Sequence, residues 1–206
     1  MSTAEKLEYY SVEAYLNAEE LSSTRNEYIN GLIRAMSKAT NRHNTVAVNV
    51  QGILWSQLKG QSCRPFNSDA KIRVRQGEGT SFYYPDASVI CESNRQTETF
   101  QDKPVVVIEV LSPSTRAIDL DEKLTAYLSI ETLEAYILLE QDKPIAIVMR
   151  RTPIGFLREV YEGLASTIDL PTIGCRLSLE EMYTSVDFTP ANVQEPEAAY
   201  MQSEGE

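Results

Sequence analysis

The chain has 206 residues, 42% of them hydrophobic and 24% charged, which is typical of a folded globular domain and excludes a wholly disordered chain. Its formal charge of -11 argues against broad, nonspecific attraction to DNA or to an anionic membrane, but a local basic groove remains compatible with it. No stretch approaches the roughly 18 consecutive apolar residues of a membrane helix. The first ten residues carry Glu5, Lys6 and Glu8 in place of a signal-peptide apolar run, so we expect a cytoplasmic protein with no membrane partner.

The cysteines and the histidine limit the metal chemistry. Cys63, Cys91 and Cys175 are odd in number, widely spaced and never in a C-x-x-C pair, so we expect three free, buried thiols rather than disulfides or a zinc site. His43 is the only histidine, so histidine-based metal clusters lack their ligands. Oxygen ligands are left, which indicates magnesium or manganese for any metal that is bound.

The N-terminal part predicts a helix, a hairpin and a longer helix. Ser11 can cap a helix over residues 11–20. Within residues 27–33, Asn30-Gly31 between apolar residues is a strong signal for a two-residue hairpin turn. Residues 41–58 then carry apolar side chains at helical spacing.

After residue 60 the pattern changes to strands, which we expect at residues 63–75, 83–91 and 104–111. In the first of these, alternation puts a polar row on one face, made of Asp69, Lys71, Arg73 and Arg75. This row is the best basic stripe of the chain.

The last third predicts a helix, three strands and a short helix. Asp119 and Glu122 resemble a capping box that opens a helix over residues 119–130. The strands are expected at residues 134–140, 145–150 and 156–161, and Ser178 opens the short helix. This order predicts an α/β sandwich with a mixed central sheet flanked by helices, an N-terminal helix-hairpin and C-terminal strand additions. We expect one domain over residues 1–189 and a flexible acidic tail over 190–206.

Glu109 stands out because it interrupts the apolar strand 104–111. Both faces of that strand are apolar, so it is expected to be central and covered on both sides. A carboxylate there is costly unless a cation or a proton meets it, and ligands often bind near the carboxyl ends of such strands. The alternative interpretation is a glutamate at the sheet rim, salt-bridged or solvated.

Lys123 and Asp86 can converge on Glu109. Lys123 occupies a core-facing position of the 119–130 helix, although a snorkelling lysine or an ion pair with Asp119 would also explain it. Asp86 follows Pro85 at a strand start, where simple turn chemistry is the alternative. Two carboxylates that bind a divalent cation, with a lysine nearby, are the minimum set for metal-assisted phosphodiester hydrolysis.

Three motifs resemble those of the Uma-type restriction endonucleases, a family of the PD-(D/E)XK nuclease superfamily. They are Tyr84-Pro-Asp-Ala-Ser-Val-Ile-Cys91, Pro104-Val-Val-Val-Ile-Glu-Val-Leu-Ser-Pro-Ser-Thr115 and Asp119-Leu-Asp-Glu-Lys123. The resemblance spans residues 11–183 and implies a restriction-endonuclease-like fold in which Asp86, Glu109 and the Val110 carbonyl bind magnesium. The superfamily places a lysine two residues after the glutamate, where this chain has Leu111, and the resemblance implies that Lys123 replaces it.

Three further residues are second-tier candidates. Asp69 alternates with basic residues, so a cross-strand ion pair is the simpler explanation. Glu27 lies on a hairpin that could fold over the site, where the resembling family often has an acid. His43, near a helix N-terminus, could contact phosphate or could serve as a cap or core residue.

The sequence thus predicts a magnesium-dependent endonuclease acting on DNA, with Asp86, Glu109 and Lys123 catalytic. Exposed late strands favour a homodimer. Two alternatives stay open: a catalytically weak or inactive nuclease-like homo-oligomer that binds or regulates, and a hydrolase acting on a small phosphoester.

Overall fold

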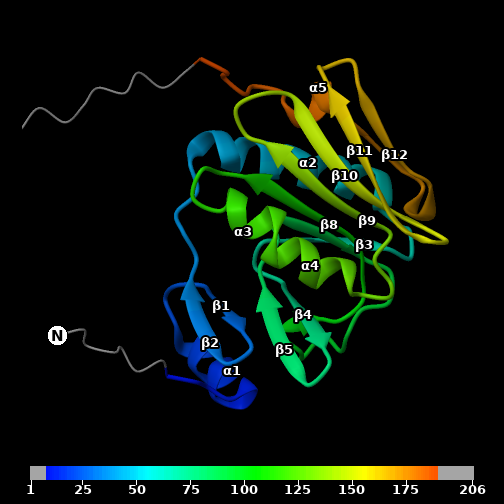
Figure 1. Cartoon of the computed structure of the whole chain (residues 1–206). Coiled ribbons are helices and arrows are strands. Elements are labelled where there is room, and N and C mark those ends of the chain that lie inside the picture. The colour runs from blue at the N-terminus through cyan, green and yellow to red at the C-terminus, as the bar shows by residue number, and fades with distance from the viewer. Residues whose placement is uncertain (1–7, 190–206) are drawn as a thin grey trace, which may run out of the picture.

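The computed structural model describes residues 8–189, which form two β-sheets, a two-stranded ribbon and several helices (Figure 1). The helices are α1 (Val12–Leu21), α2 (Asn41–Leu58), α3 (Arg116–Leu120), α4 (Glu122–Leu128) and α5 (Leu179–Met182), with the 3-10 helix η1 (Pro171–Ile173). The strands are β1 (Asn26–Ile29), β2 (Leu32–Ala35), β3 (Arg64–Asn67), β4 (Lys71–Gln76), β5 (Gly79–Tyr83), β6 (Ala87–Ile90), β7 (Phe100–Gln101), β8 (Pro104–Leu111), β9 (Ala135–Glu140), β10 (Ile145–Thr152), β11 (Gly155–Glu162), β12 (Thr167–Leu170) and β13 (Cys175–Ser178). The tail 190–206, for which the sequence predicts flexibility, lies outside the described residues.

The larger sheet has six strands in the order β11-β10-β9-β8-β6-β3 and confirms the predicted mixed α/β architecture. Strands β8 and β9 are parallel, and the other neighbours are antiparallel. Strand β8 is central, with β6 on one side and β9 on the other, as its two apolar faces predict. Its carboxyl end therefore lies deep in the fold, where a polar residue needs a partner.

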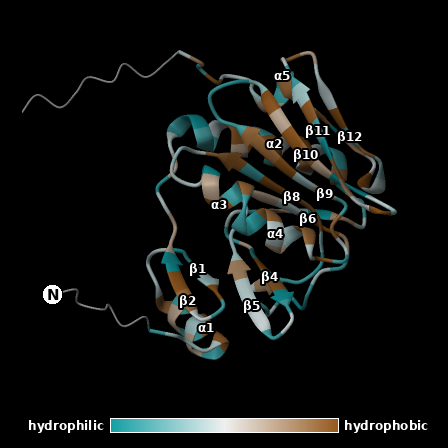
Figure 2. Cartoon of the chain, viewed as in Figure 1, coloured by the Kyte–Doolittle hydropathy of each residue, from teal (hydrophilic) through white to brown (hydrophobic). Residues whose placement is uncertain are grey.

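The two faces of this sheet are covered by different layers. Apolar side chains of α2 pack on one face together with the β12–β13 ribbon and α5, and Figure 2 shows hydrophobic colour along the strands between these elements. The other face packs against α4 and against β4 and β5 of the second sheet. The α2 residues in this core are Val46, Val50, Leu54 and Leu58, and Ile53 packs against it partly buried, as the apolar spacing of residues 41–58 predicts.

The second sheet has five strands in the order β2-β1-β5-β4-β7 and includes the N-terminal hairpin. The hairpin turn confirms the Asn30-Gly31 signal: both residues have positive φ, 48° and 102°, which a tight turn between twisted strands requires. Helix α1 begins as predicted, because the Ser11 hydroxyl accepts a hydrogen bond from the Ala14 N–H (3.1 Å).

Two predicted strands are each divided between the two sheets, which corrects the sequence interpretation. The strand expected at 63–75 is β3 and β4, separated by a turn in which the Asp69 N–H donates to Asn67 Oδ1 (3.2 Å). Asp69 is therefore a turn residue rather than a member of a polar strand face. The strand expected at 83–91 is the end of β5 and all of β6, joined by a crossover that contains Asp86.

The helix expected at 119–130 is two helices, α3 and α4, with a break at Asp121. The N-cap of α3 is Thr115, so Asp119 lies inside a helix and does not form the predicted capping box. Glu122 instead accepts hydrogen bonds from Arg34. The ribbon β12–β13 was not predicted.

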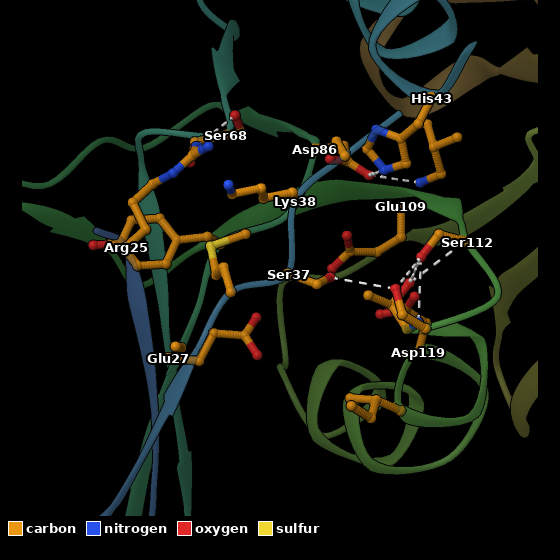
Figure 3. A pocket seen from close by; sticks show the side chains of 18 of the residues that line it. Arg25, Glu27, Ser37, Lys38, His43, Ser68, Asp86, Glu109, Ser112 and Asp119 are labelled. Carbon is orange, nitrogen blue, oxygen red and sulfur yellow. Dashed lines mark hydrogen bonds and ion pairs between the residues drawn. The ribbon is translucent and has the colours of Figure 1, made fainter. Parts of the chain in front are cut away.

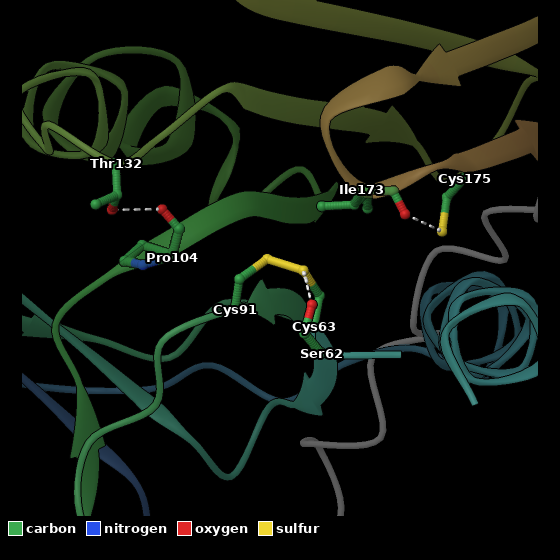
Figure 4. Close-up of a disulfide and its surroundings, with 7 residues drawn as sticks. All are labelled: Ser62, Cys63, Cys91, Pro104, Thr132, Ile173 and Cys175. Atoms are coloured by element: carbon green, nitrogen blue, oxygen red, sulfur yellow. Dashed lines mark hydrogen bonds between the residues drawn. A yellow bond between two sulfur atoms is a disulfide. The ribbon is translucent and has the colours of Figure 1, made fainter. Parts of the chain in front are cut away.

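The prediction of three free cysteines is wrong for two of them, because Cys63 and Cys91 form a disulfide (Figure 4). The register Arg64↔Ile90 makes them cross-strand neighbours just beyond the paired ends of β3 and β6. Residue spacing alone could not show this, because the pairing depends on sheet register. Cys175 is free and buried, as predicted. No helix in residues 8–189 has both the length and the apolar character needed to cross a membrane.

Candidate active site

A cavity of about 690 Å³ opens at the carboxyl end of β8. The N-terminal hairpin, the segment 36–39, the start of α2, the loop after β8 and the helices α3 and α4 contribute to its wall (Figure 3). Of the residues predicted from the sequence, the cavity brings together Glu27, His43, Asp86, Glu109, Val110 and Lys123. Asp69 does not line it.

Asp86 and Glu109 face each other across two neighbouring strands. The antiparallel register pairs Ala87 with Ile108, which puts Asp86, one residue earlier, opposite Glu109. Asp86 Oδ2 accepts a hydrogen bond from the Val110 N–H (2.7 Å) and lies 3.1 Å from His43 Nε2. Burial lowers the pKa of His43, but its bond to Asp86 more than offsets this, so the pKa is raised overall.

Lys123 and Glu109 form a buried ion pair, with Nζ 3.0 Å from Glu109 Oε1 and side chains only 6% and 5% exposed. The Tyr127 hydroxyl lies 3.4 Å from the same oxygen. Burial lowers the pKa of Lys123, but the carboxylates around it raise the pKa well above its usual range, so it remains an ammonium. Burial raises the pKa of Glu109 well above its usual range, against the effect of Lys123.

Lys123 also contacts two more buried carboxylates. Its Nζ lies 3.0 Å from Glu27 Oε1 and 3.3 Å from Asp119 Oδ1. Arg34 adds a second cation, 2.7 Å from Glu27 and 2.9 Å from Glu122. With Asp86 included, acids outnumber the lysine and arginine in this cluster, which favours uptake of another cation.

Asp119 is the site residue that the sequence interpretation missed. It is 1% exposed and lines the cavity from α3. Burial raises the pKa of its carboxyl group, against the effect of Lys123. The available signal was the i,i+4 spacing to Lys123, which was weighed only as an alternative explanation for the lysine.

The predicted basic row is not an open nucleic-acid groove. Lys71 is buried, with its ammonium 5.9 Å and 5.5 Å from the ring centres of Tyr15 and Tyr84. Arg73 donates two hydrogen bonds to Asp102 (2.6 and 2.7 Å). Asp69 is 77% exposed and pairs with Arg25 at 3.3 Å, which supports the simpler, ion-pair explanation for this aspartate, although its partner is not on a neighbouring strand.

The residues present are compatible with a divalent metal ion. Within residues 8–189, no group of three or more His, Cys, Asp or Glu side chains is arranged to hold a metal ion by itself. However, the hydrogen bonds of Asp86 go to Oδ2 and those of Glu109 to Oε1, so in this part of the chain Oδ1 and Oε2 accept none. Magnesium is commonly bound by one or two carboxylates, and water and phosphate oxygens complete its shell.

The mixed sheet and its helices form a restriction-endonuclease-like fold, whose central strand carries a glutamate opposite an aspartate, with a buried lysine beside them. The model of the family Uma2, described as "Putative restriction endonuclease", matches residues 12–180. The chain belongs to this family.

The chain is also similar to two curated proteins and to a solved structure. The chain is 28% identical over 179 residues to the uncharacterized Synechocystis protein slr1290, covering 86% of this chain and 93% of that one. It is 31% identical over 130 residues to the uncharacterized Synechocystis protein sll1609, covering 62% and 72%. The crystal structure of a "putative nuclease belonging to DUF820" from Anabaena variabilis superposes with a TM-score of 0.69 at 19% identity, covering 85% of this chain and 98% of that chain, which shows a shared fold.

Proposed function

We propose that this protein is a magnesium-dependent endonuclease that hydrolyses phosphodiester bonds in DNA. The observation that carries the proposal is the pair Asp86 and Glu109, which face each other across β6 and β8 with one unbonded oxygen each. Lys123, 3.0 Å from Glu109, supplies the cation that the superfamily motif places two residues after the glutamate, where this chain has Leu111. Manganese would suit the same oxygen ligands.

Each residue has a physical role in the proposed reaction. The Val110 N–H and His43 hold Asp86 in one orientation, and Lys123 does the same for Glu109. Asp86, Glu109 and the Val110 carbonyl would hold the magnesium ion, which would polarise a phosphoryl oxygen and acidify a bound water. The Lys123 ammonium would offset charge that develops on the phosphate.

The cavity also offers groups suited to a phosphate backbone. Lys38 is exposed at its rim and forms no ion pair within residues 8–189, and Figure 3 shows its side chain directed across the cavity. Hydroxyl groups line the loop after β8, where Ser112 Oγ lies 3.0 Å from both Ser114 Oγ and Thr115 Oγ1. Local contacts of this kind can bind a phosphate on a protein whose net charge is negative.

The test is cleavage of supercoiled plasmid DNA with magnesium or manganese. Glu109→Gln and Lys123→Met keep the size of each side chain and are expected to lower the rate about 100-fold or more, as for other groups that stabilise transition-state charge. Glu92→Gln and Lys103→Met are matched controls, because this ion pair is solvent-exposed. Cleavage that survives both site variants would refute the assignment. Parallel reactions with RNA and with a small phosphodiester would identify the substrate class.

A second candidate is a nuclease-like scaffold with weak or no catalysis that binds or regulates. The observation that favours it is the confinement of Lys123, which is 6% exposed and contacts three carboxylates. Calorimetric titration with magnesium separates the two, because an intact Asp86 and Glu109 site should bind the metal and a degenerate one should not. Binding heat that disappears in Asp86→Asn and Glu109→Gln would favour the nuclease, and absent heat combined with absent cleavage would favour the scaffold. We include a homodimer in the proposal, and the cytoplasmic location stays a prediction.

A further inference from the structure

Strand β11 is an exposed edge of the six-stranded sheet. It has eight residues, and among the described residues it pairs only with β10. Of the ten exposed large hydrophobic side chains in residues 8–189, four lie within the short segment 154–164, namely Ile154, Leu157, Val160 and Leu164. A long edge strand with exposed apolar side chains is a template for pairing with another strand.

The free backbone groups of β11 can be assigned from its bonds to β10. The Gly163 N–H donates to the Pro144 carbonyl (2.9 Å), and the register Glu162↔Ile145 continues from there. Because bonded residues alternate in an antiparallel ladder, the odd-numbered residues of β11 bond to β10. The N–H and C=O groups of Arg158, Val160 and Glu162 are therefore directed toward the free edge.

We infer that a second copy of this chain pairs with β11 in antiparallel orientation, about a two-fold axis that is perpendicular to the sheet and passes between the two Val160 residues. This specifies the interface of the homodimer in the proposed function. In this register Val160 faces the partner's Val160, and Arg158 faces the partner's Glu162. The symmetry produces the second Arg158–Glu162 contact, so the strand is complementary to itself.

The charges disfavour two alternative registers. A two-fold axis at Arg158 would oppose arginine to arginine, and one at Glu159 would oppose glutamate to glutamate. Glu159 is already used within one copy, where Arg150 donates three hydrogen bonds to it. Arg158 and Glu162 are both exposed and have no ion pair within residues 8–189. The Glu162 carbonyl accepts a hydrogen bond from Ser166 Oγ (2.6 Å), and its second lone pair can still accept a hydrogen bond from the partner strand.

The pairing would leave the two cavities independent. The six-stranded sheets of both copies become one, and seven strand spacings of about 4.8 Å separate the two β8 strands, roughly 34 Å in total. The two β8 strands run in opposite directions, so their carboxyl ends lie at opposite ends of the joined sheet. Each cavity is built from one copy, and failure of the interface would leave the nuclease proposal untouched.

The test is the oligomeric state of the full-length chain by sedimentation velocity over a range of concentrations. We expect a reversible dimer. Val160→Lys opposes two lysines at the axis, and Arg158→Glu opposes glutamates at two symmetric positions, so each should raise the dimer dissociation constant roughly tenfold or more. The exchange Arg158→Glu with Glu162→Arg restores opposite charges and should restore the dimer. Arg64→Glu, the same charge change on the opposite edge strand β3, is the matched control.

Three results would overturn this interface. One is a chain that stays monomeric up to the highest concentration measured. The second is a dimer that Val160→Lys and Arg158→Glu leave intact, which would locate the contact elsewhere, including on residues 190–206. The third is a dimer weakened equally by Arg64→Glu, which would indicate a general charge effect. Circular dichroism of each variant verifies that it is folded.

Discussion

Replacing Lys123 with methionine tests whether the buried cluster depends on its central cation. The ammonium lies 3.0 Å from Glu27 and Glu109 and 3.3 Å from Asp119. All four side chains are almost completely buried, so removing the ammonium leaves buried carboxylates without their cation. Removing one partner of a buried ion pair costs about 3–5 kcal/mol of unfolding free energy. For a chain of 206 residues this lowers the melting temperature by about 6–20 °C.

The assay is thermal and urea unfolding followed by circular dichroism, in EDTA so that no metal replaces the ammonium. Lys103→Met is the control, because its pair with Glu92 is solvent-exposed and should contribute less than about 1 kcal/mol. The double variant Lys123→Met with Glu109→Gln removes one uncompensated charge. We expect it to be less destabilised than the sum of the single variants, with a coupling free energy of about 1–3 kcal/mol. A Lys123→Met protein as stable as the control would refute the reasoning.

Three further predictions test the fold, two of them with a paired comparison variant. Gly31→Ala should lower the free energy of unfolding by about 1 kcal/mol or more in urea, since φ is 102° and a Cβ would lie 2.7 Å from Tyr9. Gly52→Ala, in open space on α2, should instead raise the free energy of unfolding by about 0.5–1 kcal/mol. Leu54→Ala should cost about 2–5 kcal/mol in the same assay and its exposed neighbour Trp55→Ala about 0.5 kcal/mol or less, so equal losses would contradict the assigned face of α2. Burial raises the pKa of Asp102, but the hydrogen bonds from Arg73 and Asn94 lower it by more, so the folded pKa is lower than the unfolded pKa of about 3.9. The stabilisation by Asp102 is therefore complete above the unfolded pKa and is lost as the pH falls through the folded pKa. Asp102→Asn should cost about 1–3 kcal/mol at pH 7 by urea unfolding, and a cost that persists in acid would contradict this.

The parts of the structure that local patterns determine were predicted well. Apolar spacing located α2, the Asn30-Gly31 pair located its hairpin, and the apolar run of β8 indicated a central strand. The convergence of Asp86, Glu109 and Lys123 followed from consecutive elements and from the family resemblance. Each of these signals lies within one element or between neighbouring ones, so tertiary contacts did not override it.

The errors concern contacts that no local pattern contains. The alternation of polar and apolar residues continues unchanged through the Asn67–Asp69 turn. The sequence pattern therefore does not show that β3 and β4 belong to different sheets. The Cys63–Cys91 bond depends on the register of β3 against β6. The sequence places Lys71 in a polar row on one strand face, but the second sheet and α1 bury it beside Tyr15. Asp119 is an exception: the sequence around it resembles a capping box, and its i,i+4 spacing to Lys123 is the local signal of the contact that the structure shows.

The cluster around Lys123 joins the N-terminal hairpin to α4, so the cavity is complete only after the hairpin has packed against the rest of the fold. Glu27 and Arg34 belong to the N-terminal hairpin, and the contact from Arg34 to Glu122 joins positions 88 residues apart. Closing so large a loop is entropically costly, so these contacts form only once the hairpin has docked. We therefore expect hydrogen exchange in β1, β2 and α4 to be coupled, because opening the hairpin removes both Glu27 and Arg34 from the cluster. A molecule that has folded its six-stranded sheet and α4, but has not docked the hairpin, would hold Glu109 and Lys123 without a complete cavity around them.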